Sequence, residues 1–146
     1  MLRYFDKDCD PEKWLPTVTF SEWLKYVHFV PGKQNNIIIF RDNDVELTMI
    51  CWDSNSKSPI HDHGGQECWL IVLQGTICET LYDDKFSRVR RHILDVDSNV
   101  TKSPLGFHKV HPINNQAVTL HIYKKPIRKY SVYDKNTSEL STVTRD

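Results

Sequence analysis

Residues 59–75, PIHDHGGQECWLIVLQG, carry two histidines one residue apart, a pair of glycines, and then Glu67 beside Cys68. In an extended chain the side chains alternate between two faces, so His61 and His63 point to the same side. Two imidazoles at such positions can bind one metal ion. Glu67 or Cys68 could also serve the ion, but adjacent residues of a strand face opposite ways. Only one of the two can therefore share the face of the histidines.

A third histidine, His108, follows the turn-like segment Pro104-Leu105-Gly106-Phe107 later in the chain. If the strands close into a barrel, His108 can come to lie beside His61 and His63. Three neutral imidazoles with open coordination positions suit zinc, iron or copper. Two histidines at this spacing also occur on ordinary protein surfaces, so the spacing alone leaves both interpretations open.

The composition is that of one soluble domain, since 39% of the 146 residues are hydrophobic and 26% are charged. This length supports one packed core and is short for two domains. Lysine plus arginine and aspartate plus glutamate number 19 each, so the charge does not indicate nucleic-acid binding. No apolar run approaches the roughly 20 residues of a membrane span, and the opening MLRYFDKDCD lacks the apolar core of a signal peptide. We expect a cytoplasmic monomer with no nucleic-acid or membrane partner.

Helix signals are confined to the N-terminal part of the chain. Asp10-Pro11-Glu12 places a capping aspartate before a proline at the first helical position. A second short helix is expected from Ser21, and Val30-Pro31-Gly32 ends the helical segment. These signals predict a helical lead-in over about residues 1–30.

From about residue 35 to residue 146, the pattern is that of short β-strands separated by turns. The turn-rich segment Arg41-Asp42-Asn43-Asp44 predicts a hairpin between the first two strands. Many short strands at even spacing are typical of a sandwich or barrel. We therefore expect one mainly β domain over residues 1–146. The expected strands are Ile37–Phe40, Val45–Trp52, Trp69–Leu73, Thr76–Leu81, Val89–Leu94, Phe107–Val110, Ala117–Tyr123 and Lys129–Tyr133.

The expected strand Ala117–Tyr123 alternates polar and apolar residues. One face carries the hydroxyl of Thr119, the imidazole of His121 and the phenol of Tyr123. Such a row can form a hydrogen-bonded relay that orients the tyrosine hydroxyl toward a bound ligand. The same alternation is typical of a half-exposed strand with a polar outer face, so the pattern by itself does not decide.

Residues 59–75 resemble the first motif of the cupin superfamily, in which H-x-H is followed by three or four residues, a glutamate ligand, six residues and a glycine. Residues 104–108, PLGFH, resemble the second motif, P-x-G-x-x-H, with one residue fewer, and His108 is the matching histidine. The resemblance implies a small jelly-roll barrel, also called a double-stranded β-helix.

This resemblance separates Glu67 from Cys68. Seven positions beyond Cys68 is Gly75, whereas seven positions beyond Glu67 is Gln74. Cys68 therefore occupies the position at which most cupins carry the glutamate ligand, and Glu67 should face away. A metal held only by histidines gains no negative charge from the protein, so it can accept a substrate thiolate and lower that thiol's pKa.

Taken together, the motifs resemble the cysteine dioxygenases, mononuclear non-haem iron enzymes of the cupin superfamily. The resemblance runs from about Trp23 to Thr144 and is far more specific than any single motif. The residues that carry it are Cys51-Trp52, Pro59-Ile60-His61-Asp62-His63, Cys68, Leu73-Gln74-Gly75, Gly106-Phe107-His108, Thr119-Leu120-His121-Ile122-Tyr123 and Val132-Tyr133-Asp134.

The resemblance implies one Fe(II) per chain and an active-site tyrosine. In the animal-type enzymes this tyrosine is joined to a cysteine by a thioether bond. A histidine behind the tyrosine completes a relay that usually begins with a serine. The matching positions here are His61, His63 and His108 for the iron, Tyr123 and Cys68 for the cross-link, and His121 and Thr119 for the relay.

One feature departs from the family. Cysteine dioxygenases bind the substrate carboxylate with an arginine shortly before the first core strand, and this chain has Asn35 or Asn36 at that place. An amide gives a neutral grip where a guanidinium gives a charged, bidentate one. Enzymes that oxidise 3-mercaptopropionate use a glutamine in this region, a part that Gln34 or either asparagine can play. Lys33 or Arg41 are the alternatives.

The resemblance thus implies an Fe(II)-dependent thiol dioxygenase that oxidises L-cysteine with dioxygen to cysteine sulfinic acid. The missing arginine keeps another small thiol, such as 3-mercaptopropionate, as an alternative substrate. A metal-binding cupin without dioxygenase activity, either an isomerase or a small-molecule binding module, is the alternative from another class. A structural zinc site is disfavoured, because such sites have four closed ligands rich in cysteine.

Overall fold

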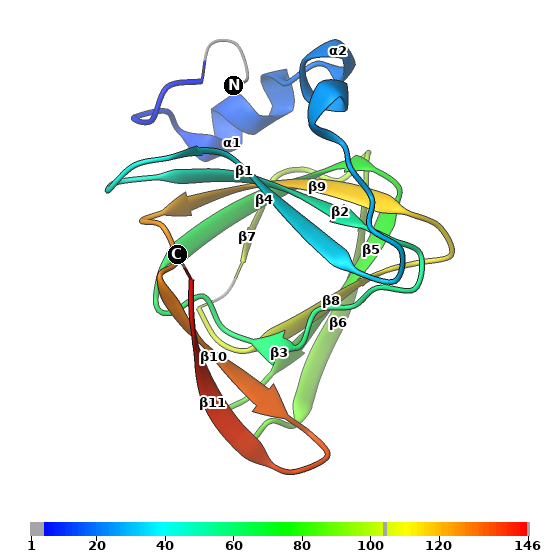
Figure 1. The fold of residues 1–146 in the computed structure, drawn as a ribbon, viewed down its shortest axis with the longest axis vertical. Helices are drawn as coiled ribbons and strands as arrows, with labels where there is room; N and C mark the ends of the chain where they lie inside the picture. The colour runs from blue at the N-terminus through cyan, green and yellow to red at the C-terminus, as the bar shows by residue number, and fades with distance from the viewer. Residues whose placement is uncertain (1–4, 104, 146) are drawn as a thin grey trace.

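The computed structural model describes residues 5–103 and 105–145, which form two facing β-sheets beneath a short helical segment (Figure 1). None of the helices in this part of the chain is long and apolar enough to cross a membrane. The helices are α1 (Pro11–Trp14) and α2 (Phe20–Trp23), each followed by a 3-10 turn, Leu15–Thr17 and Leu24–Tyr26. The strands are β1 (Gln34–Arg41), β2 (Glu46–Trp52), β3 (Ile60–His61), β4 (Glu67–Gln74), β5 (Thr76–Tyr82), β6 (Arg88–Asp95), β7 (Thr101–Ser103), β8 (His108–Pro112), β9 (Ala117–Lys124), β10 (Lys129–Asp134) and β11 (Glu139–Thr144).

Both helix starts follow from their capping residues. The Asp10 side chain accepts a hydrogen bond from the Glu12 amide at 3.1 Å, with Pro11 at the first helical position, as predicted. The second helix begins at Phe20, one residue before the expected start at Ser21, because Thr19 and Glu22 form a capping box. The helices are also shorter than the expected lead-in over residues 1–30, of which residues 1–4 lie outside the described part.

The strands form two antiparallel sheets, with the orders β1-β2-β9-β4-β7 and β11-β10-β3-β8-β5-β6. Consecutive strands β4 and β5 belong to different sheets, which is the connectivity expected of a jelly roll. The predicted jelly-roll fold is therefore confirmed. The two sheets keep separate hydrogen-bond networks in the described residues, so they face each other without closing into one continuous barrel.

The crossing from β4 to β5 depends on Gly75. Its φ is +78°, and a Cβ there would lie 2.5 Å from the Gln116 carbonyl oxygen. Only glycine tolerates both conditions. The spacing from Cys68 to Gly75 thus has a physical basis, because Gly75 fixes where β4 ends.

The apolar face of β9 packs against the helical segment. Leu120 and Ile122 are buried together with Met49 of β2, and Leu15 and Trp23 cover them from the helices. All of β9 from Ala117 to Tyr123 is buried, so the alternative of a half-exposed strand is wrong. Its polar face is turned inward, between the sheets, where a site can form.

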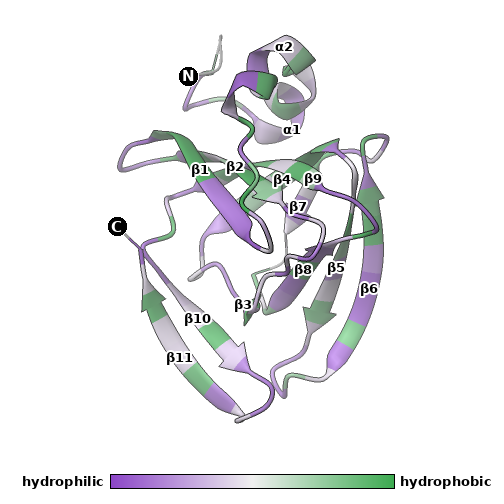
Figure 2. Cartoon of the chain, turned by 45° about the vertical axis from the view of Figure 1, so that its right-hand side comes forward, coloured by the Kyte–Doolittle hydropathy of each residue, from purple (hydrophilic) through white to green (hydrophobic). Residues whose placement is uncertain are grey.

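The predicted strands are all present, with ends shifted by a few residues. The predicted turn is also present, and Oδ1 of Asp42 accepts hydrogen bonds there from the Asp44 and Val45 amides. Three strands were not predicted, β3, β7 and β11. β1 starts at Gln34, earlier than predicted, and its first residues are hydrophilic (Figure 2). Asn35 and Asn36 consequently lie within a strand, opposite Cys51 and Ile50 of β2.

Candidate active site

The three predicted ligand histidines come together between the sheets. His61 ends β3 and pairs with His108 of β8, whereas His63 follows β3 in irregular chain, so the extended conformation assumed for both histidines ends at His61. One ring nitrogen from each of the three lies within 4.8 Å of the others. The chain then turns at Gly64, where a Cβ would clash with the Lys129 carbonyl oxygen. The backbone at Gly64 therefore packs closely against the start of β10. Pro104 of the second motif lies outside the described residues.

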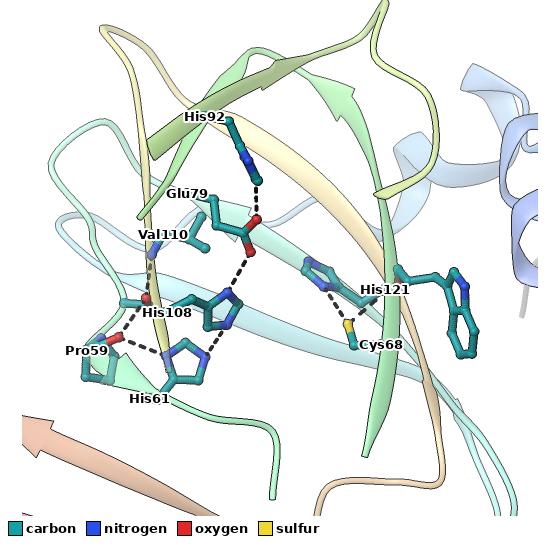
Figure 3. A network of polar contacts seen from close by, with 10 residues as sticks. Pro59, His61, Cys68, Glu79, His92, His108, Val110 and His121 are labelled. Atoms are coloured by element: carbon teal, nitrogen blue, oxygen red, sulfur yellow. Dashed lines mark hydrogen bonds and ion pairs between the residues drawn. The ribbon is translucent and has the colours of Figure 1, made fainter. Parts of the chain in front are cut away.

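The hydrogen bonds of two of these histidines leave their lone pairs facing each other. Nδ1 of His61 donates to the Pro59 carbonyl oxygen at 2.8 Å, and Nδ1 of His108 donates to Glu79 Oε2 at 2.6 Å (Figure 3). Both Nε2 atoms are then unprotonated in the neutral rings, and they lie 3.2 Å apart. Two lone pairs at this distance repel each other unless a cation lies between them. The donor set therefore fits a metal ion.

Burial keeps the imidazoles of His61 and His63 uncharged. Desolvation, followed by the charge of His108, lowers the pKa of His61 to about 4. Desolvation and the charges of His108 and His61 lower the pKa of His63 to about 2. Neutral imidazole is the form that binds a metal ion. Nδ1 of His63 is buried and has no hydrogen-bond partner in the described structure.

Glu79 supports the histidine cluster and was not found from the sequence. It lies fully buried on β5, and its two carboxylate oxygens accept from His108 at 2.6 Å and from His92 at 2.5 Å (Figure 3). Burial by itself would raise the pKa of Glu79, but the hydrogen bonds and charges of the two histidines lower it. The sequence did contain a signal for this residue. Glu79 alternates with Ile77 and Leu81 in the expected strand, so an acidic side chain shares the face of two apolar ones.

Glu67 and Cys68 face as their spacing to Gly75 predicts. Glu67 is exposed and forms an ion pair with Lys102 at 2.6 Å. Cys68 is fully buried and lies directly opposite Tyr123 in the pairing of β4 with β9. Burial raises the pKa of the Cys68 thiol, so it stays protonated near neutral pH. Burial, followed by the charge of Cys68, also raises the pKa of Tyr123 well above its ordinary value.

The polar face of β9 forms only part of the predicted relay. Oγ1 of Thr119 lies 2.7 Å from Nε2 of His121 and accepts a hydrogen bond from the Trp52 indole at 2.9 Å. Burial lowers the pKa of His121 to about 3, so the ring is neutral. Its Nδ1 lies 3.8 Å from Cys68 Sγ, and its ring stacks on Tyr123 with centroids 5.9 Å apart. Among the described residues, His121 thus contacts the sulfur and the ring of Tyr123, not its hydroxyl.

A small cavity opens beside the histidines. Its volume is about 90 Å³, which is room for several water-sized groups. Tyr123 forms part of its wall, as predicted. Gln34 and Asn36 line another part, and Gln34 Nε2 donates to Asn36 Oδ1 at 2.9 Å. Asn35 points the other way, and its amide donates to the His28 carbonyl oxygen at 2.8 Å.

Arg145 also lines this cavity and was missed from the sequence. It follows β11, which was not predicted. The available signal was the run of β-favouring residues Thr142-Val143-Thr144 directly before the arginine. Neither Lys33 nor Arg41, the two cations considered from the sequence, lines the cavity.

Comparison with protein families matches residues 17–136 to the family described as cysteine dioxygenase type I. Cysteine dioxygenase type 1 of Rattus norvegicus is 29% identical over 134 residues, which cover 85% of this chain and 67% of the relative. The human protein of the same name is 27% identical, with coverage of 85% and 67%, and that of Danio rerio is 27% identical, with coverage of 84% and 67%.

Solved structures of low sequence identity share the fold. A Klebsiella pneumoniae protein with a double-stranded β-helix domain has a TM-score of 0.63 at 12% identity, covering 76% of this chain and 88% of the other. Oxalate decarboxylase from Lactobacillus farciminis has a TM-score of 0.57 at 14% identity, covering 80% and 32%. These likenesses support the cupin jelly roll and nothing about the reaction.

Proposed function

The chain belongs to the cysteine dioxygenase family, and from that premise we propose that it is an iron(II)-dependent thiol dioxygenase whose substrate is L-cysteine. In the proposed reaction both atoms of dioxygen are added to the thiol sulfur, R–SH + O2 → R–SO2H, giving cysteine sulfinic acid. The observation that carries the proposal is a cluster of three histidines with a buried thiol where other cupins place a carboxylate. Such a cluster leaves the negative charge to be supplied by a thiolate substrate.

His61, His63 and His108 would hold the iron. Iron(II) bound there would supply the Lewis acidity that lowers the substrate thiol's pKa and the redox chemistry that dioxygen requires. The surrounding residues keep the ligands in place. The Pro59 carbonyl fixes the ring of His61, and Glu79 fixes the ring of His108. Each contact holds the imidazole in the tautomer that turns an unprotonated Nε2 toward the metal.

Tyr123 is the proposed catalytic hydrogen-bond donor. Because burial raises its pKa, the hydroxyl keeps its hydrogen at neutral pH. It can therefore donate to the substrate, and to the sulfinate oxygens as they form. Thr119 and His121 would act as positioning residues, since they fix the side of the pocket on which Tyr123 and Cys68 meet.

We also propose the cross-link between Cys68 and Tyr123. Directly opposed residues on antiparallel strands have Cβ atoms roughly 4.5–5.5 Å apart, and these two residues are such a pair. The reaction would form a bond between Sγ and a ring carbon and break one S–H and one C–H bond, and dioxygen would accept the two hydrogens and two electrons as hydrogen peroxide. The cross-link would hold the phenol in one orientation against the pocket.

The second candidate substrate is 3-mercaptopropionate. It is favoured by the neutral amides of Gln34 and Asn36, which line the cavity from the strand where related enzymes carry an arginine. Both candidates have few heavy atoms, which suits a cavity of about 90 Å³. They differ only in the amino group, so binding of the carboxylate does not distinguish them.

One set of assays tests the proposal and the substrate together. The purified protein is loaded with Fe(II) without oxygen, and oxygen uptake is then measured with L-cysteine, 3-mercaptopropionate and cysteamine. We expect uptake with a sulfinate product, fastest with L-cysteine. Faster uptake with 3-mercaptopropionate would replace the substrate and keep the reaction. No uptake with any thiol, from protein shown to contain iron, would leave a metal-binding cupin of another activity.

A further inference from the structure

We propose that Arg145, presented by the end of β11 and held by the buried Glu46, binds the carboxylate of the substrate. The inference deepens the proposed function and rests on it, since it names the residue that selects thiols bearing a carboxylate. Arg145 lies far along the chain from Asn35 and Asn36 near the start of β1, the positions expected from the sequence for this role.

Arg145 reaches the pocket by crossing from one sheet to the other. Its backbone amide donates to the Arg128 carbonyl oxygen at 2.7 Å, which fixes the end of the hairpin formed by β10 and β11. Its guanidinium then pairs with Glu46, the first residue of β2 in the opposite sheet, with Nη2 2.9 Å from Oε2 and Nη1 3.3 Å from Oε1. Glu46 lies opposite Tyr123 in the pairing of β2 with β9. The guanidinium is therefore held on the Tyr123 side of the cavity.

Glu46 is fixed in turn. It is fully buried, and the Thr48 hydroxyl donates to its Oε2 at 2.5 Å. Nη1 of Arg145 also donates to the Ile127 carbonyl oxygen at 2.9 Å. The arginine side chain is 19% exposed, so it is mostly withdrawn from water while one edge stays accessible. These contacts orient the guanidinium before any substrate arrives, which reduces the entropy lost on binding.

The contacts leave two donors free, and those two lie side by side. A guanidinium has five N–H donors. Glu46 and Ile127 account for both hydrogens of Nη1 and one of Nη2. The Nε hydrogen and the second Nη2 hydrogen have no acceptor among residues 5–103 and 105–145. They form the parallel pair along the side of the guanidinium, which is one of the two edges that bind a carboxylate with both oxygens.

The rest of the cavity offers no competing cation. Of its described lining residues, Arg145 is the only one with a permanent positive charge. Gln34 and Asn36 are neutral, and Asp62 is acidic, with Oδ1 accepting from the Gly64 and Ser131 amides. A substrate with a thiol at one end and a carboxylate at the other would reach the histidines and Arg145 within one small cavity. Thiols without a carboxylate would lose the second contact.

The test measures binding without turnover. Iron(II)-loaded protein is titrated anaerobically with L-cysteine, 3-mercaptopropionate or cysteamine, and the dissociation constants are obtained by calorimetry. For Arg145→Met we expect the two carboxylates to bind roughly ten- to a hundredfold more weakly, with cysteamine changed by less than about twofold. Arg145→Lys should give an intermediate loss, because it keeps the charge but not the paired donors.

Two further variants keep the result interpretable. Arg145→Met leaves Glu46 buried without its partner, so the double variant Glu46→Gln/Arg145→Met is measured as well, and it should show the same selective loss. Arg128→Met removes an exposed guanidinium from the same end of the hairpin and should bind all three thiols as the parent protein does. Equal weakening of cysteamine, or unchanged binding of the carboxylates, would overturn the assignment to Arg145.

Failure of this inference can be told apart from failure of the proposed reaction. If binding of the carboxylates depends on Arg145 but no oxygen is consumed, the dioxygenase proposal is wrong and the binding role stands. If oxygen is consumed and Arg145→Met leaves the dissociation constants of both carboxylates unchanged, the binding role is wrong and the reaction stands.

Discussion

At the scale of single residues, the site depends on which hydrogen bonds each histidine can make. Glu79 has no contact with the cavity, yet its carboxylate sets the tautomer of His108 and is itself held by His92. A metal ligand is usually fixed by such an outer partner, and removing that partner typically weakens metal binding by about 10–100-fold. Substitution of Glu79 therefore tests how the surrounding structure supports the metal site. Substitution of a ligand histidine would only remove the ligand itself.

For Glu79→Gln we predict that iron affinity falls by roughly 10–100-fold. An amide has one acceptor oxygen, so it cannot accept from both His108 and His92 as the carboxylate does. The measurement is competition for Fe(II) with a chelator of known affinity. His92→Gln is the matched control, because it removes only the outer partner and should have a smaller effect. Unchanged affinity in Glu79→Gln would mean that the carboxylate does not support the metal site.

The cross-link gives a second prediction at this scale. After incubation with Fe(II), thiol substrate and dioxygen, the intact mass of the protein should fall by two hydrogens, because Sγ and the tyrosine ring each lose one. Cys68→Ser should show no such loss. Cys9→Ser, which changes a thiol that does not line the cavity, should still show it. A constant mass in the parent protein after turnover would count against the bond.

At the scale of elements, the strength of the local pattern decided what could be predicted. Strands such as β2 and β9 are long and apolar or alternating, and they were found with nearly correct ends. β3 and β7 have two and three residues, too few to show a period. β11 is almost wholly exposed, so its sequence lacks the apolar alternation of a core strand. Because β11 was not predicted, Arg145, which directly follows it, was not recognised as a residue near the site.

The site shows the same division. The spacing of His61, His63, Cys68 and Gly75 is local and predicted their common face, since a glycine at a tight crossing fixes the register of the strand. Glu46 and Arg145 are 99 residues apart, and no local pattern relates them. Their pairing follows from which strands face each other across the two sheets, and this information is not contained in any single segment.

The turn after His63 yields a prediction about local structure. Gly64 and Gly65 both have positive φ, +61° and +83°, but only at Gly64 would a Cβ meet another group, the Lys129 carbonyl oxygen. Gly65→Ala should destabilise by about 1–2 kcal/mol through backbone strain alone. Gly64→Ala should cost more and also weaken iron binding, because β10 or His63 must move. Urea denaturation compares the two, and equal losses of stability would contradict the steric explanation.

At the scale of the whole molecule, stability and function are carried by opposite faces of one strand. The apolar side of β9 packs under the helical segment, and its polar side faces the cavity. Leu15 is fully buried against this apolar side, so Leu15→Ala should lower the free energy of unfolding by about 2–5 kcal/mol. The iron affinity of Leu15→Ala should stay near that of the parent protein. Leu24→Ala, at a site 46% exposed, is the control with little expected effect.

The ion pair between Glu46 and Arg145 joins the two sheets, so its loss should also affect the whole fold. Removing one partner of a buried pair leaves the other charge without compensation, at a cost of roughly 3–5 kcal/mol; because Arg145 is 19% exposed, we expect Arg145→Met to fall at the lower end. Glu46→Gln/Arg145→Met removes both charges and should be more stable than Arg145→Met alone. Chemical denaturation of the two single variants and the double variant gives the coupling between the residues. Additive losses would mean that the pair does not link the sheets energetically, and the orientation of Arg145 toward the cavity would then need another cause.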